Sequence, residues 1–310
     1  MRVVFMGTPD FSVPTLEKII AAGHQVVGVV TQPDKAKGRG RHIIYPPVKE
    51  TALKYGLKVY QPRRVREPEF IEQLKAMAPD VIVVIAFGQI LPKEILQLPP
   101  YGCINVHASL LPKYRGAAPV QWAVIRGETV SGVTTMRMDE GLDTGDMILK
   151  ESLPLADDET GGSLYEKLSK LGGDLLVQTL EKLKDGTAVF EKQDDSQAGE
   201  YARMLTKAMG EIDFSDPAVQ IERLVRGLNP WPSAYTKFRG KTLKIWKAAV
   251  SDRSYGTDPG VIVEVTKTSF TVQTGQGALI IQEVQMEGKK RMDTGAFLRG
   301  YPVSVGEKLE

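Results

Sequence analysis

The sequence predicts an α/β fold: an N-terminal doubly wound, Rossmann-like domain with a parallel sheet, followed by a C-terminal OB-like β-barrel domain. In the first half of the chain, short apolar runs alternate with helical patterns, which is typical of a sheet covered by helices on both faces. In the last third, short strand-like runs are separated by Gly, Asp or Pro turns, which is typical of a small barrel. A polar stretch separates the two patterns, so we expect domains over residues 1–188 and 208–310 with a linker over 189–207.

The first domain is predicted from apolar strands and amphipathic helices. The run DVIVVIAF at residues 80–87 is apolar and largely β-branched, as in a strand buried on both faces of a parallel sheet. Residues 68–78 carry apolar side chains at helical spacing. The other expected strands lie at residues 2–7, 25–31, 58–61 and 103–107, and the other helices at 14–22, 119–125 and 163–184.

The second domain is predicted to begin with one amphipathic helix at residues 218–227. Trp231 and Trp246 lie among apolar residues, so we expect both to pack in the core. The expected strands of the barrel lie at residues 234–238, 241–248, 260–265, 269–274 and 278–284.

The composition is that of an ordinary globular protein. Of the 310 residues, 42% are hydrophobic and 25% are charged, and the formal net charge of +2 does not by itself indicate a nucleic-acid partner. The single cysteine, Cys103, excludes an internal disulfide and a cysteine-cluster metal site, and its apolar neighbours favour a core position. No segment reaches the roughly 18 apolar residues of a membrane span, and no leader pattern precedes the first strand. We therefore expect a cytoplasmic protein and, because no long apolar stripe remains for a dimer seam, a monomer.

The strand expected at residues 103–107 carries polar groups that suggest chemistry. Asn105 and His107 are two residues apart, so on an extended strand both project from the same face. A Ser-Leu-Leu-Pro turn follows, and the glycine-rich loop at residues 139–146 supplies carboxylates about thirty residues downstream. An amide, an imidazole and a carboxylate are suited to proton transfer and to stabilising an oxyanion during acyl transfer. Ligands in doubly wound domains bind beyond the carboxyl ends of the strands, where we expect these groups to lie.

Each of these features also has a purely structural interpretation. His107 could be a core histidine with satisfied polar atoms, and Asp143 and Asp146 could form turns in Asp-Thr-Gly-Asp. The segment GTPDF at residues 7–11 closes the first strand but lacks the glycine pattern of a dinucleotide site, and Pro9 removes a backbone N–H. We expect that segment to be a tight turn or a wall of the substrate site.

The segments INVHASLLPKYRGAAP at residues 104–119 and GLDTGD at residues 141–146 closely resemble the folate-dependent formyltransferases. Further segments extend the resemblance over essentially the whole chain: GTPDF, TQPD, GRGR, NPWPSAY and KIWKA. The basic loop and the Asn-Pro-Trp-Pro segment favour the branch of this superfamily whose acceptor is a charged initiator tRNA.

The resemblance implies substrates and residue roles. Asn105, His107 and Asp143 look like the catalytic trio of the family: the first two donate to the oxyanion, and Asp143 orients His107 and assists proton transfer. The implied formyl donor is 10-formyltetrahydrofolate, the implied acceptor is methionyl initiator tRNA, and no metal is implied. The residues that match the folate-contacting turn and the walls of the pterin pocket are Ser109, Leu110, Leu111, Pro112, Phe87, Gly88, Gln89, Ile90, Asp139 and Gly141. Asp146 is expected to support the loop.

Basic residues in two places are candidates for tRNA contact. The glycine-interleaved loop at residues 34–41 carries Lys37, Arg39 and Arg41, of which Arg39 is the foremost candidate by its position in the motif. In the barrel, Lys237 and Lys244 could line one strand face with charge. A flexible solvated loop and an ordinary solvated strand face would have similar compositions.

Two other functions remain open on the sequence. A formyltransferase acting on glycinamide ribonucleotide or on an amino-sugar nucleotide would share the chemistry. The former usually has a glycine-rich phosphate loop near its start and lacks the barrel, and the latter leaves the GRGR loop unexplained. A non-catalytic RNA-binding protein would need only the barrel, and the intact set of Asn105, His107 and Asp143 argues against it.

Overall fold

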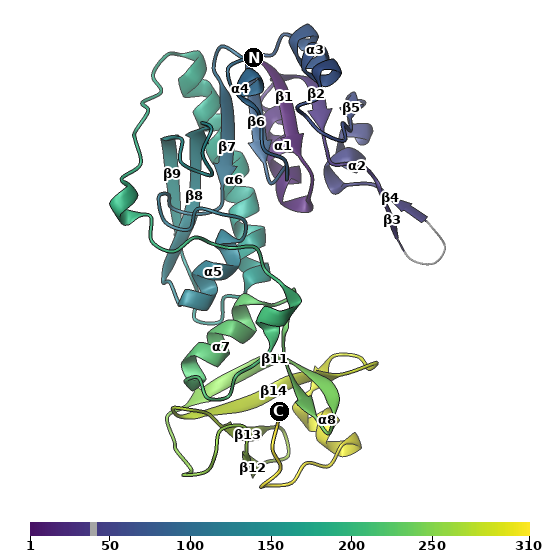
Figure 1. Cartoon of the computed structure of the whole chain (residues 1–310), viewed down its shortest axis with the longest axis vertical. Helices are drawn as coiled ribbons and strands as arrows, with labels where there is room; N and C mark the ends of the chain where they lie inside the picture. Colours follow the sequence, from purple (N-terminus) through teal and green to yellow (C-terminus); the bar gives the residue numbers. More distant parts are fainter. Residues whose placement is uncertain (38–41) are drawn as a thin grey trace. The chain divides into compact units, whose positions relative to one another are not determined.

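The structure, a computed structural model, describes residues 1–37 and 42–310 and divides into two compact units (Figure 1). The first unit comprises residues 1–119, 130–154 and 165–202, and the second comprises residues 120–129, 155–164 and 203–310. The first contains a mainly parallel sheet and the second an antiparallel one, so the predicted fold class is confirmed. The expected linker lies with the first unit as far as Ala202.

Among the described residues, seven strands form the main sheet of the first unit, in the order β5-β2-β1-β6-β7-β8-β9. The five strands from β5 to β7 are parallel, with β2 on one side of β1 and β6 on the other, which is a doubly wound arrangement. A separate hairpin pairs β3 with β4 and projects away from the sheet (Figure 1). The bounds are β1 (Arg2–Gly7), β2 (Gln25–Val30), β3 (Lys35–Lys37), β4 (His42–Ile44), β5 (Val59–Tyr60), β6 (Val81–Ile85), β7 (Cys103–His107), β8 (Val130–Arg137) and β9 (Asp146–Pro154).

The strands β8 and β9 were not predicted, and β8 runs antiparallel to β7. The apolar pattern of β8 is interrupted by Thr134 and Thr135, which are nevertheless fully buried. Because of the reversed direction, Arg137 at the end of β8 lies opposite Ile104, near the start of β7. The expectation that the loop at residues 139–146 leaves at the carboxyl ends of the parallel strands was therefore wrong: it leaves at the opposite end of the sheet.

Two helices, α1 (Val13–Ala21) and α6 (Gly161–Lys184), lie against one face of this sheet. A Cβ on Gly172 of α6 would be 2.8 Å from Cγ1 of Val106 in β7, so only glycine permits this approach. Gly173 also lies close to α1, where a Cβ would be 3.1 Å from Cγ of Lys18. Since side chains alternate along a strand, the residues on either side of Val106 project from the other face.

The other face carries α3 (Pro68–Met77) and α4 (Lys93–Leu96). Residues of both helices share one apolar cluster with Ile82 of β6 and Cys103 of β7. Asn105 and His107 alternate in phase with Cys103, so they belong to this face. The helix α2 (Pro47–Lys54) completes the first unit and contacts α1 and β5.

Among the described residues of the second unit, an antiparallel sheet has the order β10-β11-β14-β13-β12, with β15 paired to β14. Its core combines apolar strand residues with Ile221 and Val225 of α7 and Phe297 of α8. The bounds are α5 (Pro119–Arg126), α7 (Ala218–Gly227), β10 (Ala234–Phe238), β11 (Lys241–Ser251), β12 (Ile262–Val265), β13 (Phe270–Gln273), β14 (Ala278–Met286), β15 (Met292–Asp293) and α8 (Thr294–Gly300).

The last residues of the chain close this sheet into a barrel. The backbone N–H of Leu309 donates to the carbonyl of Gly260 beside β12, at 2.9 Å. On the other side, Lys237 of β10 and Glu310 exchange two backbone hydrogen bonds of 3.2 and 3.1 Å. The edge strands β10 and β12 are thereby both paired through a segment in which no strand was predicted, which satisfies edge N–H and C=O groups.

Candidate functional site

Asn105 and His107 are two residues apart on β7 and project from the same face of the sheet. Asn105 pairs in register with Val84 of β6 and Met136 of β8, and its side chain is half-buried. No hydrogen bond joins its carboxamide to any residue that the structure describes, so the two N–H donors of that amide are available to a bound substrate.

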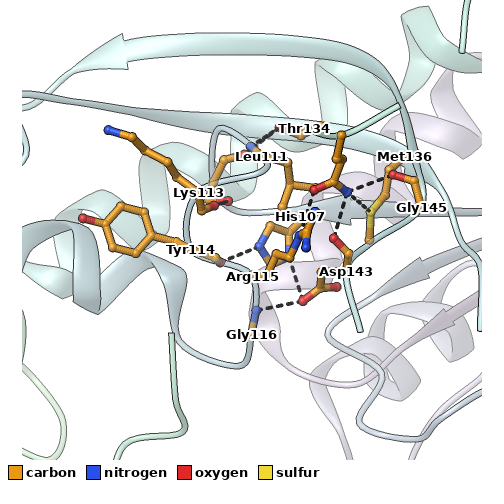
Figure 2. Close-up of polar contacts among 12 residues, drawn as sticks. His107, Leu111, Lys113, Tyr114, Arg115, Gly116, Thr134, Met136, Asp143 and Gly145 are labelled. Carbon is orange, nitrogen blue, oxygen red and sulfur yellow. Dashed lines mark hydrogen bonds and ion pairs between the residues drawn. The ribbon is translucent and has the colours of Figure 1, made fainter. Parts of the chain in front are cut away.

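His107 is 6% exposed and is held at one ring nitrogen (Figure 2). Its Nε2 is 2.9 Å from the carbonyl oxygen of Tyr114. Because a carbonyl oxygen only accepts, we assign a proton to Nε2, which donates this hydrogen bond. Its Nδ1 is 3.7 Å from Oδ2 of Asp143, beyond direct hydrogen-bond distance. The ring is therefore fixed through Nε2, and Nδ1 remains for a reacting group beside the carboxylate.

Asp143 reaches His107 from the loop between β8 and β9. That loop leaves the sheet near the start of β7, so it must fold back across the sheet face to place Asp143 beside the end of β7. The Oδ2 atom of Asp143 accepts a hydrogen bond from the backbone N–H of Gly116 at 2.9 Å. The residue has φ of +56°, a left-handed conformation that a non-glycine residue adopts at an energetic cost. The surrounding contacts must therefore hold it there.

The rest of this loop is shaped by its own side chains. Oδ1 of Asp139 accepts hydrogen bonds from the Gly141 N–H at 3.0 Å and the Thr144 hydroxyl at 2.7 Å. A Cβ on Gly145 would lie 1.9 Å from the carbonyl oxygen of Arg137, so glycine is required there. Asp146, expected to support the loop, begins β9 and forms a 3.2 Å ion pair with Arg137.

The Ser-Leu-Leu-Pro turn is tied to β8. The Thr134 hydroxyl donates to the Ser109 carbonyl at 2.7 Å and accepts from the Leu111 N–H at 3.1 Å. The Ser109 hydroxyl donates to the carbonyl of Lys113 at 2.6 Å, and the Leu111 side chain is buried. Ser109 and Leu111 thus fix the shape of the turn, while its half-buried residues are Leu110 and Pro112.

The segment that follows β6 has both anchored and exposed members. The Phe87 side chain is buried in the core, and its carbonyl oxygen accepts from the Gln32 amide at 3.1 Å. The Gln89 side chain accepts from a backbone N–H of the neighbouring loop at 2.9 Å. Gly88 and Ile90 are exposed, Ile90 by 77%. In this segment, which is one expected wall of the pterin pocket, Phe87 and Gln89 therefore fix the backbone, and Gly88 and Ile90 face solvent.

An ion pair links the other expected wall, residues 139–141, to the start of the helix that follows Ile90. Lys93, which begins α4, forms a 3.1 Å ion pair with Glu140 of the loop after β8. A cavity of about 470 Å³ lies beside this contact and is lined by parts of α4, residues 99–102 and residues 137–140. The structure thus places residues 139–141 near the segment that follows Ile90.

A chain of polar contacts connects the Phe87 carbonyl to the base of the β3–β4 hairpin. The Gln61 amide donates to the Gln32 carbonyl at 2.9 Å and to Oδ1 of Asp34 at 2.8 Å. Oδ2 of Asp34 forms a 2.7 Å ion pair with the Lys49 ammonium. The hydrogen bond from Lys49, aided by a weaker one from Gln61, holds the pKa of Asp34 below its ordinary value, although desolvation acts in the opposite direction. Since β3 begins at the next residue, this ion pair anchors the hairpin base.

Sequence reasoning missed Gly116 and Gln193 as members of the site. Gly116 lies within the motif at residues 104–119, but nothing in the motif showed that its N–H would bind Asp143. Gln193 lies in the polar stretch interpreted as a linker, where no periodicity singles it out. Its side chain donates to the carbonyls of Asp143 and Gly145. Both contacts are long-range and follow from the tertiary fold.

The candidate tRNA residues are spread over both units. Arg39 and Arg41 lie outside the described residues, and Lys37 is the last residue of β3. Lys237 is exposed on β10, and Lys244 on β11 is half-buried with its ammonium 5.6 Å from the centre of the Trp246 ring.

The prediction that both tryptophans pack in the core was wrong. Trp231 is 55% exposed. Trp246 is half-buried on the outer side of β11, because the alternating positions Leu243 and Ile245 take the core face. The guanidinium of Arg291 lies 4.8 Å from the Trp246 ring centre, so Lys244 and Arg291 both place a positive charge near this ring.

Cys103 is fully buried, and burial raises the pKa of its thiol to about 12, which removes it as a nucleophile.

Within residues 1–37 and 42–310, no group of three or more His, Cys, Asp or Glu side chains is arranged to hold a metal ion. No helix in the same ranges has the length and apolarity that crossing a membrane requires.

Comparison with known proteins gives matches over nearly the whole chain. The family described as formyl transferase matches residues 1–180, and the formyl transferase C-terminal domain matches residues 204–302. A methionyl-tRNA formyltransferase of Agathobacter rectalis is 60% identical over 306 residues, covering 99% of this chain and 98% of that protein. Another, from Lachnospira eligens, is 56% identical and covers 100% of this chain and 99% of its own length.

Solved structures share the fold at lower identity. WlaRD, a sugar 3N-formyl transferase solved in the presence of dTDP and 5-N-formyl-THF, superposes with a TM-score of 0.66. It is 20% identical and the superposition covers 94% of this chain and 99% of that chain. At this identity the likeness establishes the fold.

Proposed function

Since the chain belongs to the formyl transferase family, and within it to the methionyl-tRNA formyltransferases, we propose that it formylates methionyl initiator tRNA for translation initiation. The formyl donor is a folate. The observation that supports this function at the level of residues is the arrangement around His107: Nε2 is anchored on Tyr114, while Nδ1 faces Asp143 next to the unengaged Asn105 amide.

The proposed reaction begins when the α-amine of the methionyl group attacks the formyl carbon. A C–N bond forms, and the formyl oxygen takes the negative charge of the tetrahedral intermediate. The Asn105 amide donates a hydrogen bond to this oxygen, and so does Nδ1 of His107 when the ring carries a proton on both nitrogens. Each such donor typically lowers the barrier enough to change the rate by ~10²–10³. Asp143 orients the imidazole and stabilises its charged form through the Oδ2 atom 3.7 Å away.

The intermediate then collapses, and the bond between the formyl carbon and N10 of the folate breaks. The proton lost by the attacking amine passes to N10, assisted by the His107–Asp143 pair. The products are a formamide on the tRNA and tetrahydrofolate, so atoms and electrons balance without a metal or an enzyme-bound acyl group.

We propose 10-formyltetrahydrofolate as the donor, because its N10 carries the formyl group that this chemistry needs. Gly88 and Ile90 supply exposed surface for the pterin end, with the loop of residues 139–141 on the opposite wall. Leu110 and Pro112 are half-buried in a turn whose shape is fixed from within, so they are suited to contact the donor.

We propose that residues 1–188 form the catalytic domain and 208–310 the tRNA-binding domain, and that 189–207 is a linker whose part up to Ala202 packs on the first unit. The acceptor end of the tRNA would contact the loop that carries Lys37, Arg39 and Arg41. The body of the tRNA would contact the outer strand face that carries Lys237 and Lys244, where Trp246 offers an aromatic ring for stacking. A cytoplasmic monomer is sufficient for these steps.

A single assay tests the function: transfer of formyl from 10-formyltetrahydrofolate to charged initiator tRNA, with glycinamide ribonucleotide and an amino-sugar nucleotide as control acceptors. We expect formyl transfer to the charged initiator tRNA and none to the two control acceptors. Asn105→Ala, His107→Ala and Asp143→Asn should each lower kcat by ~10²–10³. Losses below tenfold in all three would contradict the assignment, and losses confined to KM would make the trio a binding group.

A further inference from the structure

Gln193 occupies a place in the first unit that neither the family resemblance nor the proposed trio explains. It lies in the polar segment after α6, far in sequence from the reacting groups, and its side chain is half-buried. Its carboxamide nitrogen donates to the carbonyl oxygens of Asp143 at 2.8 Å and Gly145 at 2.9 Å. Its carboxamide oxygen accepts from Nε of Arg115 at 2.9 Å.

The two ends of this amide connect the two backbone segments that set the geometry of His107. One end holds the loop in which Asp143 has its left-handed conformation. The other holds Arg115, whose preceding residue, Tyr114, supplies the carbonyl that anchors the His107 ring. The residue after Arg115 supplies the N–H that binds the Asp143 carboxylate. Figure 2 shows Asp143, Gly145 and Arg115 gathered around His107.

The contacts require an amide and no other common side chain. Two carbonyl oxygens need N–H donors, while the Arg115 guanidinium needs an acceptor, and the glutamine carboxamide supplies both on one planar group. A glutamate has the same shape and keeps the contact with Arg115, but it points an oxygen at the two carbonyls. A methionine has similar length and makes neither set of hydrogen bonds.

We infer that Gln193 is a positioning residue for formyl transfer: by clamping residues 143–145 to Arg115, it holds the Asp143 carboxylate at His107 Nδ1. A misplacement of about 1 Å in such a group costs on the order of 10²-fold in rate. Gln193 touches no reacting atom, so it acts through the groups that it holds, and its contacts with residues 143 and 145 make the placement of Asp143 its main effect. This inference rests on the proposed function of the site.

The experiment compares Gln193→Glu and Gln193→Met with Gln178→Glu, which makes the same chemical change at an exposed position of α6. We expect kcat to fall at least tenfold in both Gln193 variants, with KM for the folate and for the tRNA within about threefold of wild type. Gln178→Glu should keep wild-type kcat. Melting temperatures of all variants identify any loss caused by unfolding.

A double variant separates positioning from a general structural effect. When Asp143→Asn is already present, Gln193→Glu should lower kcat by less than about twofold, because the group it positions no longer acts. Full additivity of the two losses, a kcat for Gln193→Glu within twofold of wild type, or an effect on KM alone would each overturn the inference. If wild-type protein does not formylate methionyl-tRNA, the proposed function fails instead, and the two failures are distinguishable.

Discussion

At the scale of single residues, the site depends on backbone groups as much as on side chains. His107 is anchored by a carbonyl oxygen, and the carboxylate of Asp143 is held by an N–H. These groups belong to Tyr114 and Gly116, on either side of Arg115. Gly116 has φ of +125°, and a Cβ there would lie 2.6 Å from the carbonyl oxygen of Ala202. The segment can approach Ala202 this closely only because residue 116 has no side chain.

We predict that Gly116→Ala displaces the N–H that binds Asp143. The variant should lose about 1–3 kcal/mol of stability through backbone strain and lower kcat by at least tenfold. Gly199→Ala is the matched control, since Gly199 also has positive φ, +65°, but no atom would lie within 4 Å of its Cβ. Urea unfolding and steady-state kinetics measure both effects. If Gly116→Ala and Gly199→Ala have equal kcat, the predicted displacement of the N–H that binds Asp143 is contradicted.

Two members of the proposed trio follow from the alternation along a strand, which places Asn105 and His107 on one face, and the resemblance to the formyltransferases added Asp143. Their partners could not be identified in that way. Gln193 and Gly116 act on Asp143 across separations of 50 and 27 residues, and no local pattern records a contact of that kind. The sequence also did not show that the backbone groups of Ser109 and Leu111 bind the Thr134 hydroxyl.

At the scale of elements, apolar periodicity predicted the parallel strands and the long helices. It failed where the buried residues of an element are polar. The strand β8 escaped prediction because Thr134 and Thr135 satisfy their hydroxyls inside the fold. The short hairpin β3–β4 escaped because it lies in a basic segment with no apolar pattern. Its base is instead fixed by the ion pair of Asp34 with Lys49, whose side chain is only 14% exposed.

This ion pair predicts a pH dependence. The pKa of Asp34 is lowered in the folded protein from 3.8, so its carboxylate stabilises the fold fully above that value and the stabilisation disappears as pH falls through the lower folded pKa. Wild type should therefore exceed Asp34→Asn in unfolding free energy by a constant amount from pH 7 to about pH 5. The difference should vanish in strong acid.

The control for that experiment is Asp174→Asn, which breaks an ion pair whose carboxylate is 55% exposed. Such pairs contribute little, so this variant should match wild type at all pH values. Urea titrations at a series of pH values measure the differences. A gap between wild type and Asp34→Asn that widens toward acid would contradict the predicted direction.

At the scale of the whole molecule, a net charge of +2 does not by itself indicate a nucleic-acid partner, so the proposed tRNA contacts are tested residue by residue. If the exposed Lys237 contacts tRNA phosphate, binding should weaken steeply as salt rises. Lys237→Ala should weaken binding and reduce the slope of log affinity against log salt by about 0.7–0.9, the contribution of one phosphate contact.

Lys267→Ala removes another exposed lysine of the second unit and serves as the control. It should leave the slope unchanged, because Lys267 lies in the turn between β12 and β13, off the strand face that carries Lys237 and Lys244. Equilibrium binding of initiator tRNA over a range of KCl concentrations gives the slopes. Identical slopes for wild type and Lys237→Ala would remove this residue from the tRNA surface.

The contacts of Gln193 and Ala202 with the site have a practical consequence for dissecting the enzyme. A fragment that ends at residue 188 contains Asn105, His107 and Asp143. It lacks the Gln193 amide, which holds the Asp143 loop, and Ala202, whose backbone N–H donates to the Arg115 carbonyl. Domain swaps among relatives with different acceptors would break the same contacts if they were joined there. A graft that extends through Ala202 transfers the proposed catalytic groups together with Gln193 and Ala202, which hold the segments around them.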